Sequence, residues 1–235
     1  MTHIDHDTVV KLILAGQTPP ASWVPHIVEL RLERTHIADL GSVAALTSLR
    51  RLVLSHTLIR DIAPLSALQQ LSRLELTRSR VADVTSVAAM PHLQSLHLSF
   101  TPVADITRLA GLADLEGCFL TGTLVRDAAP LAGLLRLERL DLGDTEVSNL
   151  APLAAMTHLR SLDLSGTRVV DLMPLAGLTR LQYLDLTGTP VVDLLPLASL
   201  TDLRRLDLRS TRADPSVLAG LPRCRIITVP VRRTR

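Results

Sequence analysis

Aromatic residues are almost absent from this chain of 235 residues. Phenylalanine, tyrosine and tryptophan together make up 2% of the sequence, although 47% of the residues are hydrophobic. Any core must therefore be filled by leucine, valine, isoleucine and alanine. Such a uniform set suits a structure whose packing problem is the same at every step, because an ordinary globular core needs side chains of mixed shape to interlock.

Other shortages exclude whole classes of protein. The two cysteines, Cys118 and Cys224, are too few for a disulfide framework and indicate a reducing compartment. No apolar run is long enough to cross a bilayer, and the first residues carry acids where a secretory signal needs positive charge. The formal net charge of +2 is too small to indicate a nucleic-acid or membrane partner. We therefore expect a cytoplasmic protein, or one exported as an effector without a cleaved signal.

A pattern of leucines repeats with a constant spacing of 22 residues. The motif LxxLxL, with isoleucine in its first place once, starts at Ile27, Leu49, Leu71, Leu93, Leu115, Leu137, Leu159, Leu181 and Leu203. The first part of each unit alternates as a half-buried strand does, with positions 4 and 6 inward and positions 3, 5 and 7 outward. One unit cannot bury its leucines alone, but stacked copies cover each other and form a parallel sheet over an aliphatic core.

The full unit reads LxxLxLxxTxVxDLxPLAxL and resembles the 22-residue leucine-rich repeat of bacterial, internalin-like proteins. The resemblance implies an α/β solenoid, a right-handed superhelix with a parallel sheet on its concave side and short 3₁₀ turns on its convex side. We expect about nine repeats over residues 27–229 and a last partial one from Cys224, with Ile227 and Val229 at strand positions. Residues 1–26 are expected to form a helical N-terminal cap and residues 230–235 a basic C-terminal tail.

Two polar positions interrupt the aliphatic pattern. Position 9, where the family usually has asparagine, holds threonine or Ser79, whose hydroxyl can bond backbone groups where the chain leaves the strand. Position 13 holds aspartate or Asn149 before a turn that often begins with proline, which is typical of capping residues. In the N-terminal cap, residues 7–16 predict a short helix with Asp7 or Thr8 as N-cap and Gly16 as its stop.

No motif indicates catalysis. The sequence has no phosphate-binding glycine loop, nucleophile elbow or zinc-spaced cysteine set, so we expect neither enzyme activity nor a cofactor. The segment HIDHD, residues 3–7, could hold a metal, but a solvated tail is the simpler interpretation. Cys118 stands at a strand position normally filled by leucine and is expected to be a small buried hydrophobe.

The outward strand positions are therefore the candidate binding surface. They run from arginines through a middle of His97 and aromatic rings to an acidic strip, and we expect a protein partner to lie along them with its apolar anchor at Phe100 and Phe119. The alternative is that the repeat consensus merely places a soluble residue outward. The candidate partner-binding residues are Arg51, Arg73, His97, Phe100, Phe119, Asp141, Asp163, Tyr183, Asp185 and Asp207. We expect Arg51 and Arg73, with Arg78 and Arg80, to form a basic surface, and Arg139, Arg160, Arg204 or Arg205 to compensate the aspartates.

Two further surfaces have competing interpretations. Val170, Met173, Val192 and Leu195 could form a homodimer contact, or they are tolerated surface hydrophobes. Arginines gather near the C-terminus, but the scarcity of rings leaves little for stacking on nucleic-acid bases, so nucleic acid is not the expected partner. We predict a non-enzymatic protein–protein interaction scaffold. The alternative is the substrate-recognition domain of a larger bacterial effector such as a ubiquitin ligase.

Overall fold

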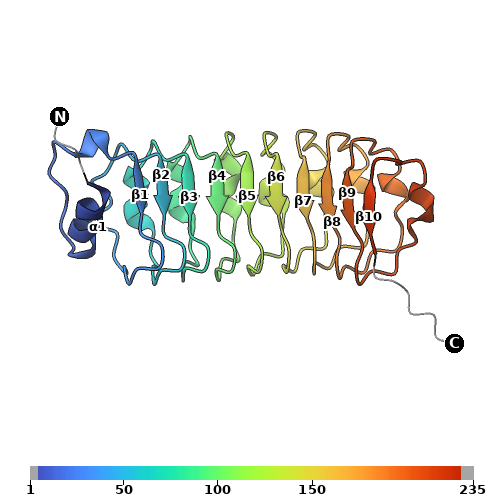
Figure 1. Ribbon diagram of the computed structural model, residues 1–235, viewed down its shortest axis with the longest axis horizontal. Coiled ribbons are helices and arrows are strands. Elements are labelled where there is room, and N and C mark those ends of the chain that lie inside the picture. Colours follow the sequence, from blue (N-terminus) through green and yellow to red (C-terminus); the bar gives the residue numbers. More distant parts are fainter. Residues whose placement is uncertain (1–4, 229–235) are drawn as a thin grey trace. The chain divides into compact units, whose positions relative to one another are not determined.

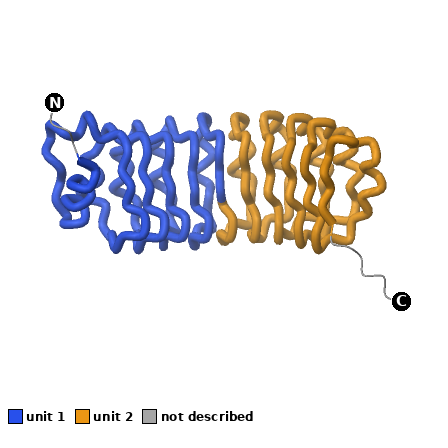
Figure 2. Tube along the Cα trace, viewed as in Figure 1, with its two compact units in different colours: residues 1–119 blue, residues 120–235 orange. Residues whose placement is uncertain are grey.

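A computed structural model describes residues 5–228 and divides the chain into two compact units, Met1–Phe119 and Leu120–Arg235 (Figure 2). In each unit the chain winds in successive coils, and each coil contributes one strand of three residues (Figure 1). The strands of unit 1 are β1 (Glu29–Arg31), β2 (Arg51–Val53), β3 (Arg73–Glu75), β4 (Ser95–His97) and β5 (Gly117–Phe119). Those of unit 2 are β6 (Arg139–Asp141), β7 (Ser161–Asp163), β8 (Tyr183–Asp185), β9 (Arg205–Asp207) and β10 (Arg225–Ile227). Val229 and the expected tail at residues 230–235 lie outside the described residues.

Short 3₁₀ helices lie behind the strands in the view of Figure 1, on the other side of each coil. In unit 1 they are η1 (Val24–His26), η2 (Ala63–Ala67), η3 (Thr85–Ala89) and η4 (Thr107–Gly111). In unit 2 they are η5 (Ala129–Leu131), η6 (Ala151–Leu153), η7 (Met173–Leu175), η8 (Leu195–Leu197) and η9 (Pro215–Leu218). The expected combination of strands and short 3₁₀ helices is confirmed.

Within each unit, strands that follow one another in the sequence pair in parallel. Residues one repeat apart are partners, as Leu52 is with Leu74 and Leu162 with Leu184. Hydrogen bonding between coils continues past the strands, where the His56 amide donates to the Thr77 carbonyl at 2.8 Å. This register places each outward position beside the same position of the next coil.

The core is built from the same positions of every coil. In the coil that begins at Leu181, the buried residues are seven aliphatic ones, one proline and one threonine: Leu181, Leu184, Leu186, Thr189, Val191, Leu194, Pro196, Leu197 and Leu200. Inward positions 4 and 6 of the strand are therefore as predicted. Burying a large aliphatic side chain contributes about 1.5–3 kcal/mol, so each interface between coils supplies a similar share of the stability.

The hydroxyl at position 9 forms the backbone bond that the sequence predicts. In eight coils the threonine Oγ1 donates to the carbonyl oxygen of position 6 at 2.6–2.7 Å, for example Thr145 to Leu142. Ser79 differs, because its Oγ accepts from the Val81 amide at 3.5 Å. The threonine bond satisfies a buried polar group where the chain leaves the strand.

The side chain at position 13 closes the turn that precedes each 3₁₀ segment. Its Oδ1 accepts a hydrogen bond from the backbone amide two residues later at 2.7–3.1 Å, as Asp193 does from Leu195. Asp214 differs, because it is itself the N-cap of η9 and accepts from the Ser216 amide at 2.9 Å. The position-13 side chains lie one residue before the N-caps of η2–η8, which have no side-chain cap bond, so the predicted capping role is replaced by a turn that leads into each 3₁₀ segment.

The N-terminal helix α1 (His6–Leu14) begins earlier than the sequence predicts. Asp5 is the N-cap, not Asp7 or Thr8, because the backbone of Asp5 is extended and its carboxylate accepts the amides of both those residues. Gly16 ends the helix with φ +72°, as predicted. Val9 and Ile13 of α1 are buried, and the helix contacts β1.

Position 8 of each coil has a left-handed backbone. Three of these positions are glycines, Gly122, Gly166 and Gly188, with φ between +63° and +69°. The other six carry side chains at φ between +52° and +60°: Arg34, His56, Arg78, Phe100, Asp144 and Ser210. A side chain in this conformation costs roughly 1–2 kcal/mol, so these six positions store strain that the neighbouring coils must hold.

We expect Thr145→Val to destabilise the protein. The substitution keeps the shape of a buried side chain but removes its hydrogen bond to the Leu142 carbonyl, a loss of about 1 kcal/mol. Urea denaturation followed by circular dichroism measures the change. The matched control is Thr157→Val, which alters an exposed threonine and should change the free energy of unfolding by less than about 0.5 kcal/mol. Equal stability of the two variants would contradict the role of the hydroxyl.

Candidate functional site

The outward side chains of β1–β5 form what we call the strand face of unit 1, and two of its arginines share one glutamate. Glu75 Oε1 lies 2.9 Å from Arg51 Nη2 and 2.8 Å from Arg73 Nε. Burial opposes ionisation of Glu75, but the bonds from Arg73 and Arg51 outweigh it and lower the pKa of this carboxyl. Arg51 also lies 3.6 Å from Glu29. Around Arg51 and Arg73 the expected basic surface is thus an ion-pair network, because Glu29 and Glu75 each contact one arginine of their own strand and Arg51 of the strand between them.

His97 and Phe119 form a stacked pair on the same face, which we call the aromatic platform. They are register partners on β4 and β5, with ring centroids 4.2 Å apart and planes inclined by 14°. Ser95 Oγ lies 2.9 Å from His97 Nε2. Gly117 makes room for this arrangement, because a Cβ atom there would lie 3.1 Å from Phe119 Cε2. Phe119 is half-buried, so the platform presents a flat surface fixed by its neighbours.

Phe100 belongs to a different stack from Phe119, although the sequence groups the two as one anchor. It occupies the left-handed position 8, and 45% of its surface is exposed. The Arg78 guanidinium lies 4.4 Å from the centre of its ring. This cation–π contact contributes about 0.5–1 kcal/mol at an exposed site. A large ring therefore stands where glycine would be unstrained.

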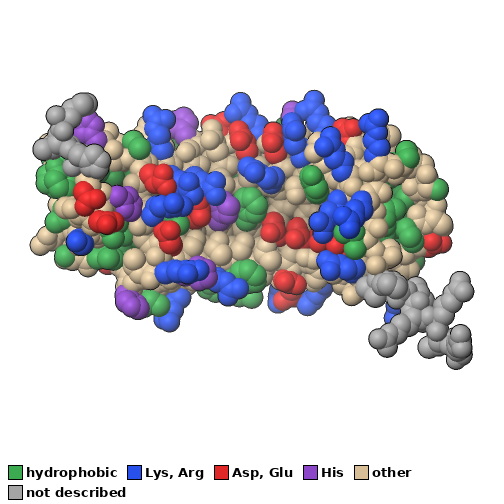
Figure 3. Space-filling view, in the orientation of Figure 1, with side chains coloured by type: hydrophobic (Ala, Val, Ile, Leu, Met, Phe, Trp, Pro, Cys, Tyr) green, Lys and Arg blue, Asp and Glu red, His purple; other side chains and the backbone are tan. Residues whose placement is uncertain are grey.

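The strand face of unit 2, the outward side of β6–β10, carries a row of aspartates at position 5. Asp141, Asp163, Asp185 and Asp207 are consecutive register partners on β6–β9, and we call them the carboxylate row. Each Oδ1 accepts a hydrogen bond from the backbone amide two residues later at 2.8–3.2 Å. Figure 3 shows acidic side chains gathered over β6–β9 with arginines beside them. The predicted strip exists and its carboxylates are fixed by the backbone.

The middle of the carboxylate row and its Asp207 end differ in charge compensation. Burial raises the pKa of the Asp163 carboxyl, and the carboxylates of Asp141 and Asp185 raise it further against the bonds from Ser165. Asp207 is also buried, but its bonds from Arg209 and Thr187 outweigh burial and lower its pKa. Arg209 Nε lies 2.8 Å from Asp207 Oδ1.

The arginine that mainly compensates the charge of Asp207 is not one of the four that the sequence indicates. Of the four expected, Arg205 lies 3.6 Å from Asp207 Oδ2, whereas Arg160 pairs with Glu138 at 3.7 Å. Arg209, two residues after Asp207, makes the closest contact. The signal that sequence reasoning missed is this spacing of two at the end of β9, where extended backbone puts alternate side chains on the same face.

A hollow of about 200 Å³ opens on the strand face of unit 2. Its sides are formed by Ser161, Tyr183 and Arg205 at position 3 and by Asp163, Asp185 and Asp207 at position 5. Tyr183 is 48% exposed. The structure therefore brings four of the candidate residues, Asp163, Tyr183, Asp185 and Asp207, together around one concavity; Asp141 belongs to the row but not to the hollow.

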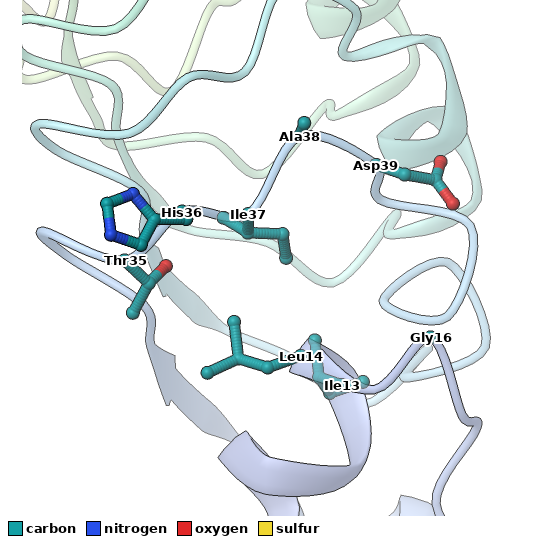
Figure 4. Close-up of a pocket in the computed structure, with 8 residues that line it drawn as sticks. All are labelled: Ile13, Leu14, Gly16, Thr35, His36, Ile37, Ala38 and Asp39. Atoms are coloured by element: carbon teal, nitrogen blue, oxygen red, sulfur yellow. The ribbon is translucent and has the colours of Figure 1, made fainter.

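A second hollow, in unit 1, was not predicted from the sequence. It has a volume of about 580 Å³ and lies between the end of α1 and the segment 35–39. Figure 4 shows Ile13 and Leu14 on one side and His36 and Ile37 on the other. Its lining is largely apolar, and periodicity could not indicate it because it arises where a helix meets the first coil.

Cys118 and the described residues of the segment HIDHD have structural roles. Cys118 is fully buried in β5, as expected. In the segment HIDHD, His3 lies outside the described residues, Asp5 caps α1, and His6 Nε2 accepts from the Arg31 amide at 3.4 Å. Among residues 5–228, no three His, Cys, Asp or Glu side chains are placed to hold a metal ion. No helix in that range is long and apolar enough to cross a membrane.

The apolar residues on the flank of unit 2 are all exposed. Val170, Met173, Val192 and Leu195 expose between 59% and 65% of their surface. Residues 170 and 192 stand at position 12, and residues 173 and 195 at position 15, of two successive coils. We call these four residues the apolar flank.

Comparison with known proteins supports the leucine-rich-repeat pattern. A family model described as a leucine-rich repeat matches residues 155–171, and no curated protein matches the chain. An internalin from Listeria monocytogenes (inlF) superposes with a TM-score of 0.82 and 24% identity, covering 95% of this chain and 73% of that one. Internalin C2 of the same organism superposes with a TM-score of 0.69 and 25% identity, covering 94% of this chain and 91% of that one. A plant peptide hormone receptor, RGFR1, in complex with RGF2, superposes with a TM-score of 0.69 and 18% identity, covering 90% of this chain and 41% of that one. The expected leucine-rich-repeat fold, with internalin-like repeats, is confirmed.

We expect Asp163→Asn to stabilise the protein at pH 7. The pKa of Asp163 is raised above its ordinary value of 3.8 in the folded chain. Its contribution to stability is therefore greatest at acid pH and is lost as the pH rises through the folded pKa. Asparagine keeps the acceptor for the Ser165 amide and removes the repulsion.

Urea denaturation at several pH values tests this expectation. The variant should be more stable than the unmodified protein at pH 7, and the difference should shrink below the ordinary aspartate pKa. Asp202→Asn, at an exposed position outside the row, should show no such trend. A variant that is less stable at pH 7 would refute the electrostatic interpretation of Asp163.

Proposed function

We propose that this leucine-rich-repeat chain, whose coils are similar to those of the internalins, is a non-enzymatic platform that binds another protein through its strand faces. The observation that supports the proposal is that outward side chains on both faces are already held in place. His97 and Phe119 are stacked on each other over Gly117. The carboxylates of unit 2 are bonded to their own backbone. Side chains fixed before association lose little conformational entropy when a partner binds.

The choice of residues also supports a binding role. Packing dictates the inward positions, but it does not require a phenylalanine at position 8 or four aspartates in register. Phe100 holds a strained backbone, and the carboxylate row brings like charges close together. Exposed rings and uncompensated charge are frequent where proteins meet partners. One of the similar structures, the plant receptor, is described as a complex with a peptide hormone.

The second candidate function, substrate recognition within a larger bacterial effector, also requires binding of a protein through the strand faces. It differs only in what else is attached to the chain.

For location, we propose the cytoplasm, because both cysteines are thiols and a reducing compartment preserves thiols.

We expect Phe100→Gly to weaken partner capture at least about tenfold, which corresponds to about 1.4 kcal/mol. Glycine suits the left-handed backbone, so the variant should be as stable as the unmodified protein or more so by up to about 1 kcal/mol. Capture is measured by affinity pull-down from the source cell with quantitative mass spectrometry. Asp144→Gly makes the same backbone change in unit 2 and is the matched control.

Charge reversal tests unit 2 in the same assay. Asp163→Lys with Asp185→Lys should reduce capture if the carboxylate row holds a basic segment. If neither this pair nor Phe100→Gly changes what is captured, neither the carboxylate row nor the ring at position 8 takes part in binding, and the platform proposal fails.

We further propose that the apolar flank associates with a second copy of this chain. Four neighbouring apolar residues that expose most of their surface favour burial against a partner. Light scattering over a range of protein concentrations should show a mass that rises toward that of a dimer. The double variant Met173→Lys with Leu195→Lys should stay monomeric. The control Leu124→Lys, at an exposed leucine outside the flank, should still dimerise as the unmodified protein does. A strictly monomeric unmodified protein would end the dimer proposal.

A further inference from the structure

The hollow in unit 2 contains negative charge that the chain does not neutralise. Asp163 and Asp185 line it side by side, as register partners on β7 and β8. Within the described part of the chain neither carboxylate forms an ion pair. The arginines of this region are used elsewhere: Arg160 pairs with Glu138, and Arg209 pairs with Asp207. Two half-buried carboxylates therefore face the hollow without an arginine in contact, although the charge of Arg209 acts on Asp185 from a distance.

Asp207 gives a second and independent sign that this hollow accepts a positively charged group. Its side chain is 1% exposed and lines the hollow. Oδ1 accepts bonds from Arg209 and from Thr187 Oγ1, at 2.8 and 3.1 Å. Oδ2 is buried and has no hydrogen-bond partner, since Arg205 Nη2 remains 3.6 Å away. A buried carboxylate oxygen without a donor is unfavourable unless something completes its environment.

The geometry favours one kind of cation. Carboxylates on adjacent strands lie about 4.8 Å apart, a separation that a flat guanidinium with five donors can bridge. The exposed ring of Tyr183 offers a face on which such a plane can stack. A metal ion is a poorer match, because in residues 5–228 no three ligating groups converge on one point. Arg205 lines the Asp207 end of the hollow and repels other cations there, so an incoming cation is favoured at the Asp163–Asp185 end.

We infer that this hollow binds the side chain of one arginine from a protein partner, with the guanidinium between the carboxylates of Asp163 and Asp185 and against the ring of Tyr183. The inference rests on the proposed platform function and names the chemistry that one of its faces recognises. Binding supplies the missing counter-charge to Asp163 and Asp185. It also places positive charge beside Asp207, the register partner of Asp185.

The test uses the full chain and the blocked tripeptide acetyl-Gly-Arg-Gly-amide. Tyr183 is the only tyrosine of the chain, so the proton resonances of its ring report on the hollow directly. We expect the arginine tripeptide to shift these resonances saturably. The same tripeptide with citrulline, which has the shape of arginine without its charge, should cause no saturable shift. The lysine tripeptide should bind more weakly, because an ammonium group cannot bridge both carboxylates in one plane.

Variants locate the site. Asp163→Asn with Asp185→Asn keeps the two backbone bonds of the row and should weaken binding of the arginine tripeptide at least about tenfold. The matched control, Asp144→Asn with Asp202→Asn, removes the same charge at exposed positions outside the hollow and should bind as the unmodified protein does. Circular dichroism confirms that each variant is folded.

Three outcomes would overturn the inference: no shift of Tyr183, an equal shift with citrulline, or equal weakening in the control variant. Each leaves the platform proposal standing if partner capture still depends on Phe100 or on charge reversal of the row. Conversely, tripeptide binding without any effect of strand-face variants on partner capture would leave the hollow as an arginine site and refute the platform. The two proposals can therefore fail separately.

Discussion

Mutual burial between neighbouring coils is the constraint on which the rest of this structure depends. A single coil cannot hide its seven aliphatic side chains, and it is stable only when the same positions of the next coil cover them. The buried threonine shows how strict this condition is. Its hydroxyl is tolerated because the carbonyl of position 6 accepts its proton, so a polar atom in the core becomes a bond that fixes the exit from the strand. Packing thus dictates the inward positions and leaves the outward ones free to vary.

The strand faces of the two units use that freedom in opposite ways. Parallel register places equal positions of successive coils side by side, so like charges in one row repel unless neighbours compensate them. In unit 1, Glu75 lies between Arg51 and Arg73, and the face is close to neutral there. In unit 2, aspartate recurs at position 5, and among residues 120–228 only Asp207 of this row has an arginine in hydrogen-bond contact. The second face therefore retains electrostatic energy that a cationic partner can relieve.

Backbone strain marks another outward position where packing is not the explanation. Every coil turns through a left-handed residue at position 8, and glycine satisfies that turn at no steric cost. Phe100 instead places a large ring there and lies beneath the Arg78 guanidinium. Strained residues persist when the surrounding structure holds them, and they gather at sites of function. Unit 1 thus offers a fixed aromatic platform and, separately, a ring held on a strained turn.

Periodicity in the sequence was enough to determine the repeat, the inward and outward positions, and that the polar residues at positions 9 and 13 bond the backbone. These follow from local geometry, because a residue's place in a coil decides whether it faces core or solvent. The tertiary structure alone decided how outward side chains pair. Glu75 between two arginines, Phe119 stacked on His97 over Gly117, and Asp207 held by Arg209 all depend on side-chain orientation and on contacts between residues of different strands or at a spacing of two. Capping by Asp5, in place of the expected Asp7 or Thr8, depends in the same way on where the backbone becomes extended. A repeat specifies which positions meet, but the atoms that touch are set by the residues that happen to occupy neighbouring coils.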